Sequence, residues 1–191
     1  MANYKSKKTR VMTIVHGKSE YCICSSIKSN LKIKHEIYAK KRGRNSIQIN
    51  DLENILNNNI FGSFKKFITE YPDIEIEKKK LINFKLFIIM DVDDCTLENK
   101  NRFIRKEMFA KHWMKDNIIP IYNDPDLEKT MKDIKIEVNK KRDYIEIFPT
   151  NEGDLDLTMA KDFLKKLKKC RCTNLEEYVE YCIDIVEENL K

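Results

Sequence analysis

Hydrophobic and polar positions form blocks along the chain that predict strands and helices in turn. Residues 10–15 are almost continuously apolar, which predicts a short strand buried on both faces, and Gly17 ends it. From Ser19 onward an isoleucine or leucine recurs every four residues, which is the spacing of an apolar helix stripe, and Ser19 is the expected N-cap. The chain therefore begins as strand, tight turn and helix.

The same alternation continues to about residue 130. Further strands are expected over 32–39, 84–90 and 117–122, and helices near 47–56, 61–71, 99–113 and from Leu127. Strands that alternate with helices favour a parallel sheet. We expect an α/β fold over residues 8–130, with a small parallel sheet flanked by helices.

The remaining residues, 131–191, are expected to pack on the same domain. Apolar and polar residues alternate over 134–138 and 145–147, which predicts a hairpin that turns at residues 140–142. The last 35 residues predict two helices, the second of which starts with a capping box of Thr173 and Glu176. The acidic outer face of this helix is a candidate docking surface for a protein partner, and its glutamates are Glu176, Glu177, Glu180, Glu187 and Glu188.

Composition narrows the class of protein. With 191 residues, 41% hydrophobic and 36% charged, the chain suits one globular domain. Its longest apolar runs are far shorter than the roughly 20 residues of a spanning helix, and its N-terminus has no apolar stretch that would serve secretion. We expect a cytoplasmic protein that does not cross a membrane, and the sequence leaves open whether it is a monomer or a homo-oligomer.

The cysteines are expected to be thiols, as in a reducing compartment. Two Cys-x-Cys pairs raise the question of zinc. Structural zinc sites usually space their cysteines by two to four residues, and both pairs fall within helix-like patterns, so buried thiols are the preferred interpretation. The six are Cys22, Cys24, Cys95, Cys170, Cys172 and Cys182.

Positive charge is concentrated near the N-terminus. Residues 1–50 hold twelve Lys or Arg and two acids, a net charge of +10 against +6 for the whole chain. The densest cluster surrounds Gly43 and consists of Lys40, Lys41, Arg42 and Arg44. Such a cluster attracts phosphates, so a nucleic acid is the expected partner, and an ordinary solvated loop is the alternative.

Two short segments carry candidate chemistry. The segment His16-Gly17-Lys18-Ser19-Glu20 is not a P-loop, because Met12 stands where that loop needs its first glycine. The segment places a histidine at the end of a strand and a carboxylate in the first turn of the next helix. The alternative for this carboxylate is that it serves only the helix dipole. In Asp91-Val92-Asp93-Asp94 the first and third residues of an extended segment face the same side.

These segments are expected to meet at one edge of the sheet. Parallel strands present their carboxyl ends at the same edge, where open α/β sheets bind ligands. Glu20, Asp91 and Asp93 would then form a cluster of three carboxylates, for which Mg²⁺ or Mn²⁺ is the typical partner. The alternative for the aspartates is a pair of Asx turns that close the strand.

These motifs resemble the TOPRIM domain of topoisomerases, bacterial primases, and OLD-type and RloB-like nucleases. Residues 16–20 stand where the family has Glu-Gly-x-x-Asp/Glu, and Asp91-Val92-Asp93 matches its Asp-x-Asp. The segment from Asn123 to Glu128 is similar to an acidic segment of RloB-like proteins, a small stand-alone branch associated with mobile elements and phage defence. The resemblance covers roughly residues 8–130.

The resemblance implies a metal-dependent nuclease that cleaves DNA or RNA. Glu20, Asp91 and Asp93 would hold Mg²⁺ or Mn²⁺, His16 would be a ligand or general base, and Glu128 is a further candidate. Nucleic-acid contacts would come from Lys18, Lys40, Lys41, Arg42 and Arg44. Because His16 replaces the family's first glutamate and removes a negative charge, the alternative is a non-catalytic subunit of a defence complex that binds nucleic acid or a partner.

Overall fold

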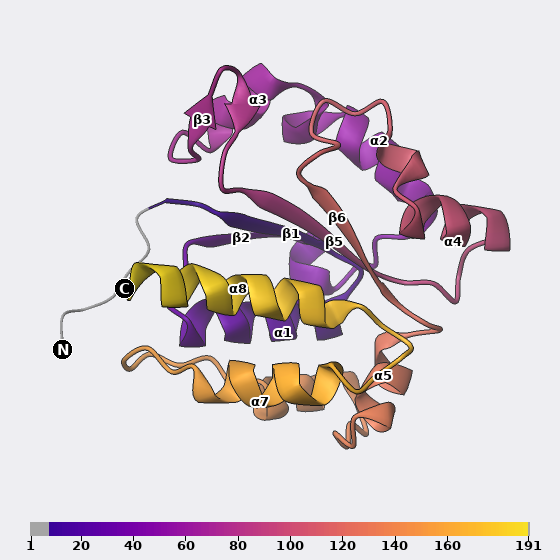
Figure 1. Ribbon diagram of the computed structural model, residues 1–191. Coiled ribbons are helices and arrows are strands. Elements are labelled where there is room, and N and C mark those ends of the chain that lie inside the picture. The colour runs from indigo at the N-terminus through magenta and orange to yellow at the C-terminus, as the bar shows by residue number, and fades with distance from the viewer. Residues whose placement is uncertain (1–7, 191) are drawn as a thin grey trace.

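The computed structural model describes residues 8–190 and has a four-stranded parallel sheet at its centre (Figure 1). The strand order is β2-β1-β5-β6, so β1 and β5 are the central strands. The α/β class and the flanked parallel sheet are confirmed. The strands are β1 (Val11–Val15), β2 (His35–Tyr38), β5 (Lys85–Asp91) and β6 (Ile118–Asn123).

Helices cover both faces of the sheet. On one face α1 and α8 pack nearest the strands, with α7 on the outer side and α5 beside β6, and α2, α3 and α4 lie on the opposite face (Figure 1). The short helix α6 packs on α1. The first group is α1 (Lys18–Asn30), α5 (Leu127–Asp133), α6 (Tyr144–Ile147), α7 (Thr158–Leu167) and α8 (Leu175–Asn189). The second is α2 (Leu52–Asn57), α3 (Phe64–Glu70) and α4 (Leu97–Ile104).

Short elements connect these layers. A two-stranded hairpin, β3 (Ile76–Glu77) and β4 (Lys80–Leu81), precedes β5. Single 3-10 turns are η1 (Lys40–Gly43), η2 (Ile49–Asp51), η3 (Asn59–Gly62), η4 (Glu107–Phe109) and η5 (Lys141–Asp143).

The two faces of the sheet bury separate hydrophobic cores. Successive strand side chains point to opposite faces, so Val11 and Val15 of β1 join the core under α1 and α8, whereas Met12 and Ile14 join the core under α2, α3 and α4. All five β1 residues are buried. The apolar run is therefore explained by burial on both faces, as expected.

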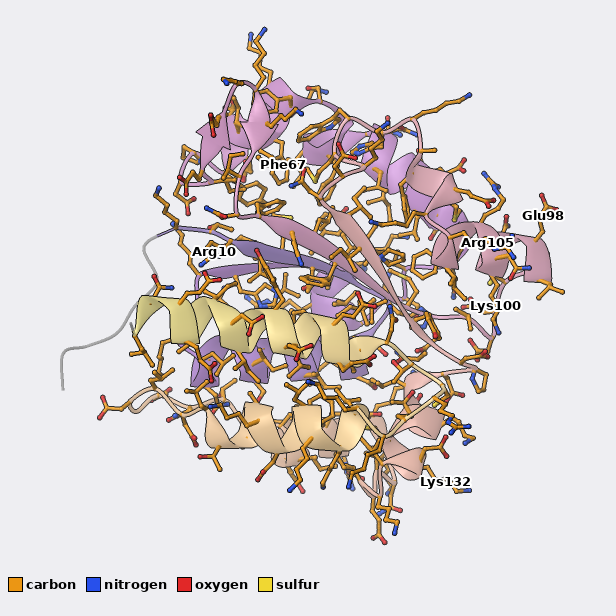
Figure 2. All side chains as sticks on the ribbon, in the orientation of Figure 1. Arg10, Phe67, Glu98, Lys100, Arg105 and Lys132 are labelled. Carbon is orange, nitrogen blue, oxygen red and sulfur yellow. The ribbon has the colours of Figure 1, made fainter. Side chains whose placement is uncertain are left out.

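Aromatic side chains fill much of the second core. Phe67, labelled in Figure 2, is completely buried, and its ring lies 5.1 to 6.1 Å from the rings of Phe61, Tyr71, Phe84 and Trp113. These rings are core residues of α3 and its neighbours, not a platform for stacking bases.

The predicted hairpin over residues 134–147 is wrong. Within the described chain this stretch contains no strand and forms η5 and α6. Tyr144 and Phe148, four residues apart, lie on one helical face and pack with Phe163 into the core under α1. Helical spacing of the large aromatic residues decided the conformation, and Ile145 and Ile147 lie nearer the surface.

Three helix boundaries also differ from the prediction. Helix α1 starts at Lys18 with Gly17 as N-cap, so Ser19 is a buried residue of the first turn. The helix expected over 99–113 ends at Ile104, because Lys106 adopts a left-handed conformation with φ of 63°. The capping box is absent: Thr173 donates its hydroxyl proton toward β6, and α8 follows Asn174.

The acidic face of α8 is partly neutralised within the chain. Arg10, labelled in Figure 2, lies 2.7 Å from a carboxylate oxygen of Glu188, and two lysines of the α7 region pair with other glutamates of the same helix. Docking of a protein partner here stays a prediction. Among the described residues, no helix has the length and apolar character needed to cross a membrane.

All six cysteines are free thiols, as expected. Cys22, Cys24 and Cys182 are buried, which agrees with their interpretation as core residues. Cys170 and Cys172 are different, because they lie in the loop between α7 and α8 and not within a helix.

Candidate acidic site at the carboxyl edge of the sheet

The carboxyl ends of the strands bring the two predicted segments together. His16 leaves β1 beside β5, where its backbone N–H donates to the carbonyl of Ile89 at 2.9 Å. Asp91 ends β5 and pairs in register with Asn123 at the end of β6. The Nε2 atom of His16 lies 4.0 Å from Oδ2 of Asp91. The expected meeting of these segments at one sheet edge is confirmed for His16 and Asp91.

Asp91 is a buried carboxyl group at this edge. Its side chain is only 9% exposed, and its Oδ1 accepts hydrogen bonds from Asn123 Nδ2 at 3.1 Å and from the backbone N–H of Leu127 at 3.0 Å. Burial, and after it the negative charge of Glu20, raises the pKa of Asp91 to about 9. The two donors orient Asp91 through Oδ1 and leave Oδ2 on the side of His16.

Glu20 has two roles in the first turn of α1. Its Oε2 accepts from the backbone N–H of Gly17 at 2.9 Å, which stabilises the helix start. The carboxyl group is also buried, and this burial raises its pKa, while nearby His16 opposes the shift and Glu128 adds to it. Glu20 therefore caps its own helix and contributes charge to the site.

Asp93 does not share the position of Asp91. The extended conformation ends at Asp91, and Asp93 lies exposed in the turn that follows, so the argument from alternating strand side chains fails there. Its charge still helps to raise the pKa of Asp91. Within residues 8–190, ligand atoms of Glu20, Asp91 and Asp93 are not all within 4.8 Å of one another. The predicted carboxylates face one edge without forming a closed set of ligands.

Two more titratable residues, Glu128 and Tyr144, interact electrostatically with these carboxyl groups, and the sequence motifs indicated only the first of them. Glu128, in the first turn of α5, is exposed and raises the pKa of both Glu20 and Asp91. Tyr144 of α6 has a buried hydroxyl without a well-formed hydrogen bond, and burial together with Glu128 and Glu20 raises its pKa well above the usual range. Tyr144 was not identified from the sequence because it lies in the stretch that was wrongly predicted as a hairpin.

Asn123 was noted only as the first residue of an acidic segment, yet its side chain is one of the two donors that orient Asp91. Its amide donates to Asp91 and its Oδ1 accepts from the hydroxyl of Thr173 at 2.9 Å. A polar residue at the end of the strand next to β5 was the signal that could have identified it.

The basic cluster lies beside this edge. Gly43 packs so closely on the turn between β1 and α1 that a Cβ atom on it would lie 2.7 Å from the carbonyl oxygen of Gly17. Lys41, Arg42 and Gly43 are consecutive left-handed residues, with φ of 49°, 56° and 80°. This conformation is uncommon for residues other than glycine, and here it is adopted by two cationic residues that are both exposed.

The cations of the cluster differ in their partners. Lys41, Arg42 and Arg44 are exposed and make no ion pair with the described part of the chain, so they are available to a polyanion. Lys40 is held by Asp51 at 2.9 Å, and the Lys18 ammonium lies 5.1 Å from the ring centre of Tyr21.

Some side chains at this edge carry ligand atoms of the kind that divalent cations accept, although they do not form a closed set of ligands in the part of the chain that the structure describes. Glu20 and Asp91 offer buried carboxylate oxygens, which Mg²⁺ and Mn²⁺ both accept, and His16 offers a nitrogen that suits Mn²⁺ better. Nδ1 of His16 is buried and has no hydrogen-bond partner, so the ring is not committed to a structural contact through that atom.

Comparison of the chain with protein-family models, curated proteins and solved structures gave no match to any of them.

Proposed function

We propose that this protein is a TOPRIM-like, metal-dependent nuclease that cleaves phosphodiester bonds of DNA or RNA. The observation that carries the proposal is the pair of buried carboxyl groups, Glu20 and Asp91, at the edge where exposed cations also lie. Burial raises the pKa of both carboxyl groups, and the charge of Glu20 raises that of Asp91 further, so the two are costly to ionise together without a cation. A cation bound between the two carboxylates would compensate their negative charge, and a phosphate of the nucleic acid would compensate the positive charge of the basic cluster.

Each residue has a part in this proposal. Glu20, Asp91 and Asp93 would hold Mg²⁺ or Mn²⁺, which supplies Lewis acidity at a phosphoryl oxygen when bound. His16 faces the same edge and would accept the proton of the attacking water. Lys41, Arg42 and Arg44 bind the phosphate backbone, and Asn123 keeps Asp91 oriented through the hydrogen bond to Oδ1.

Metal binding is the first test. Mn²⁺ at 100 times its dissociation constant stabilises the folded state by about 2.7 kcal/mol, which at about 2 to 4 °C per kcal/mol raises the melting temperature by roughly 5 to 11 °C. Asp91→Asn should abolish the shift. Asp162→Asn removes an exposed carboxylate of α7 and should keep it. Equal shifts in parent and Asp91→Asn would contradict the proposed site.

Cleavage is the second test. Nicking of plasmid DNA and cleavage of labelled RNA should require Mn²⁺ or Mg²⁺ and should be lost in His16→Ala, whose melting temperature stays close to that of the parent. His16→Glu returns an oxygen ligand and a negative charge, so it should support cleavage with a preference shifted toward Mg²⁺. An alanine variant as active as the parent would remove His16 from the mechanism.

Two observations favour a second candidate, a protein that binds nucleic acid without cleaving it. Nε2 of His16 lies 4.0 Å from Oδ2 of Asp91, so the two side chains contact each other without a metal between them, and the three carboxylates do not form a closed ligand set among the described residues. This candidate predicts binding in EDTA and no cleavage in any variant, His16→Glu included.

Both candidates require the basic cluster, which can be tested separately. Replacing Lys41, Arg42 and Arg44 by alanine should flatten the salt dependence of duplex-DNA binding by up to about 0.9 in log–log slope per lost phosphate contact. The matched control replaces three exposed lysines of the β3-β4 hairpin, Lys78, Lys79 and Lys80. If both triple variants change the slope equally, binding follows net charge and not the cluster.

A further inference from the structure

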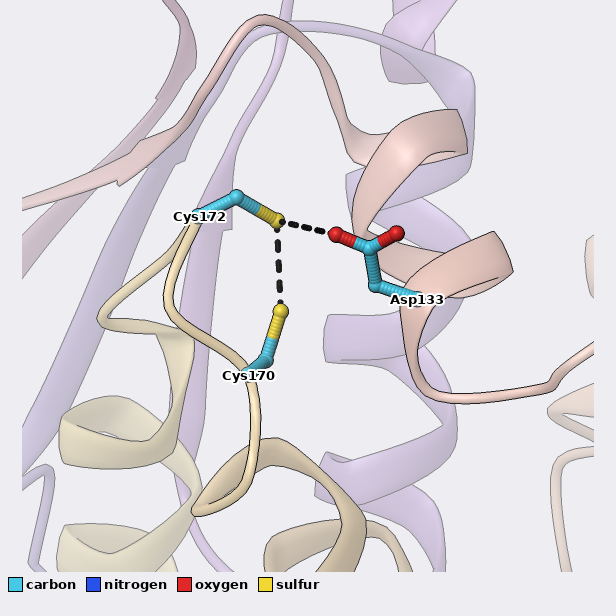
Figure 3. A group of neighbouring side chains, drawn as sticks. All are labelled: Asp133, Cys170 and Cys172. Carbon is cyan, nitrogen blue, oxygen red and sulfur yellow. Dashed lines mark hydrogen bonds between the residues drawn. The ribbon is translucent and has the colours of Figure 1, made fainter.

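A second group of possible metal ligands lies where α5 meets the loop between α7 and α8. Figure 3 shows Asp133, at the end of α5, facing Cys170 and Cys172 of that loop. The two sulfur atoms are 3.2 Å apart, and Sγ of Cys172 lies 3.5 Å from Oδ2 of Asp133. One ligand atom from each residue lies within 4.8 Å of the others. Three ligands from two separate segments thus converge on one point.

These distances suit a tetrahedral cation. With Zn–S near 2.3 Å and Zn–O near 2.0 Å, a tetrahedral angle places two sulfurs about 3.8 Å apart and a sulfur and an oxygen about 3.5 Å apart. The sulfur–oxygen distance of 3.5 Å already agrees, and the 3.2 Å between the sulfurs requires an opening of about half an ångström. A disulfide would need a larger movement, to about 2 Å, and has no use for the carboxylate.

Neighbouring groups hold the carboxylate and the loop in place. Lys129, one helical turn before Asp133, pairs with Oδ1 of Asp133, which leaves Oδ2 for the sulfur side. The backbone N–H of Asp124 donates to the carbonyl of Cys172 at 2.7 Å, and Thr130 Oγ1 lies 3.5 Å from its sulfur. Outer partners of this kind orient ligands in metal sites.

We propose that Asp133, Cys170 and Cys172 bind a thiophilic divalent cation, with Zn²⁺ as the physiological ion. Two thiolates favour zinc over Mg²⁺, because soft sulfur ligands select soft or borderline metals. Cys170 and Cys172 are half-buried and Asp133 is exposed, so an ion can enter and a water molecule can complete four-coordination. The zinc interpretation that the sequence disfavoured returns because this Cys-x-Cys pair is in a loop that also meets a carboxylate.

The site has a structural consequence that does not depend on the proposed nuclease function. Thr173 follows Cys172 and donates to Asn123, which in turn donates to Asp91. A cation that joins the loop to the end of α5 therefore fixes the segment that holds the end of β6.

The test uses the full chain, reduced and freed of metal with EDTA, and titrated with Co²⁺ as a spectroscopic probe. We expect one equivalent to give a thiolate-to-cobalt charge-transfer band and the intense visible bands of a tetrahedral site. Zn²⁺ should displace the cobalt and Mg²⁺ should not. Cobalt held by the carboxylates of the acidic site would give no sulfur band, so failure here is distinguishable from failure of the proposed function.

Variants assign the ligands. Cys170→Ser and Cys172→Ser should each lose the sulfur band, and Asp133→Asn, an exposed position, should weaken Co²⁺ affinity at least tenfold while the band persists. Cys95→Ser changes another half-buried thiol and should leave the titration unaltered. Melting temperatures in EDTA show whether each variant is folded. If a serine variant does not fold, the Asp133→Asn variant still tests whether this group of residues binds the metal.

Three outcomes would overturn the proposal. The first is a parent protein without a sulfur band, and the second is a Cys170→Ser, Cys172→Ser double variant that retains it. The third is a parent that binds no Co²⁺ and loses two titratable thiols on exposure to oxidised glutathione, which would make the pair a redox pair.

Discussion

Replacing Gly43 by alanine tests whether the basic cluster is built onto the acidic site. Gly43 has φ of 80°, and an added Cβ would lie 2.7 Å from the carbonyl oxygen of Gly17 and 2.8 Å from Cα of Lys18. Both contacts are to backbone, so no side-chain rotation relieves them. The left-handed conformation costs alanine about 1 to 2 kcal/mol, and crowding of this kind costs about 1 to 3 kcal/mol.

The chain has two ways to respond, and both are measurable. If the loop stays in place, the free energy of unfolding falls by about 2 to 5 kcal/mol, which lowers the melting temperature by roughly 4 to 20 °C at 2 to 4 °C per kcal/mol. If the loop lifts away, the stability loss is smaller, and Lys41 and Arg42 leave the site, so duplex-DNA binding weakens. Thermal unfolding and binding at fixed salt, measured on the same sample, separate the two responses.

Gly62→Ala is the matched control. Its Cβ would also meet a backbone oxygen at 2.7 Å, that of Asn57, on the opposite face of the sheet from α1. This variant should lose stability and keep its affinity for DNA relative to the folded fraction. A Gly43→Ala protein with parental melting temperature and parental DNA affinity would refute the close packing of the cluster on the turn.

Three further predictions concern the cores and the site. Phe67→Ala should lower the free energy of unfolding by about 3 to 5 kcal/mol in urea denaturation, because it leaves a cavity among four aromatic rings; a loss below 1 kcal/mol would contradict that packing. Burial lowers the pKa of His35 to about 3, so the unfolded chain binds the extra proton and stability should fall as pH drops from about 6.5, by at most about 1.4 kcal/mol per pH unit. His35→Asn should reduce this slope, and an unchanged slope would assign it to other groups. Tyr144→Phe should leave stability unchanged or raise it slightly, since the lost hydroxyl has no well-formed hydrogen bond, whereas a loss above about 1 kcal/mol would reveal a partner.

The hydrophobic pattern was sufficient to predict the four strands of the parallel sheet and most of the helices beside them. Continuous apolar runs specified strands buried on both faces, and four-residue spacing specified helices, because each element must bury the residues that its own period brings together. Since parallel strands end at a common edge, these elements also indicated that the segments holding Glu20 and Asp91 would lie at the same edge of the sheet. The alternation of strand side chains did not predict the position of Asp93 correctly. The strand ends at Asp91, so Asp93 is no longer in the extended conformation that would place it beside Asp91.

Contacts between distant segments decided the rest. Residues 134–147 alternate as a strand would, yet Tyr144 and Phe148 bury a helical face under α1, because the gain from covering that core exceeds a local preference for strand. Thr173 was predicted to cap a helix, yet its hydroxyl donates to the backbone carbonyl of Tyr122 in β6. Cys170 and Cys172 gain a carboxylate partner from α5 that no spacing in the sequence announces. A sequence period encodes what an element buries, whereas the partner of a polar side chain depends on which elements the fold brings beside it.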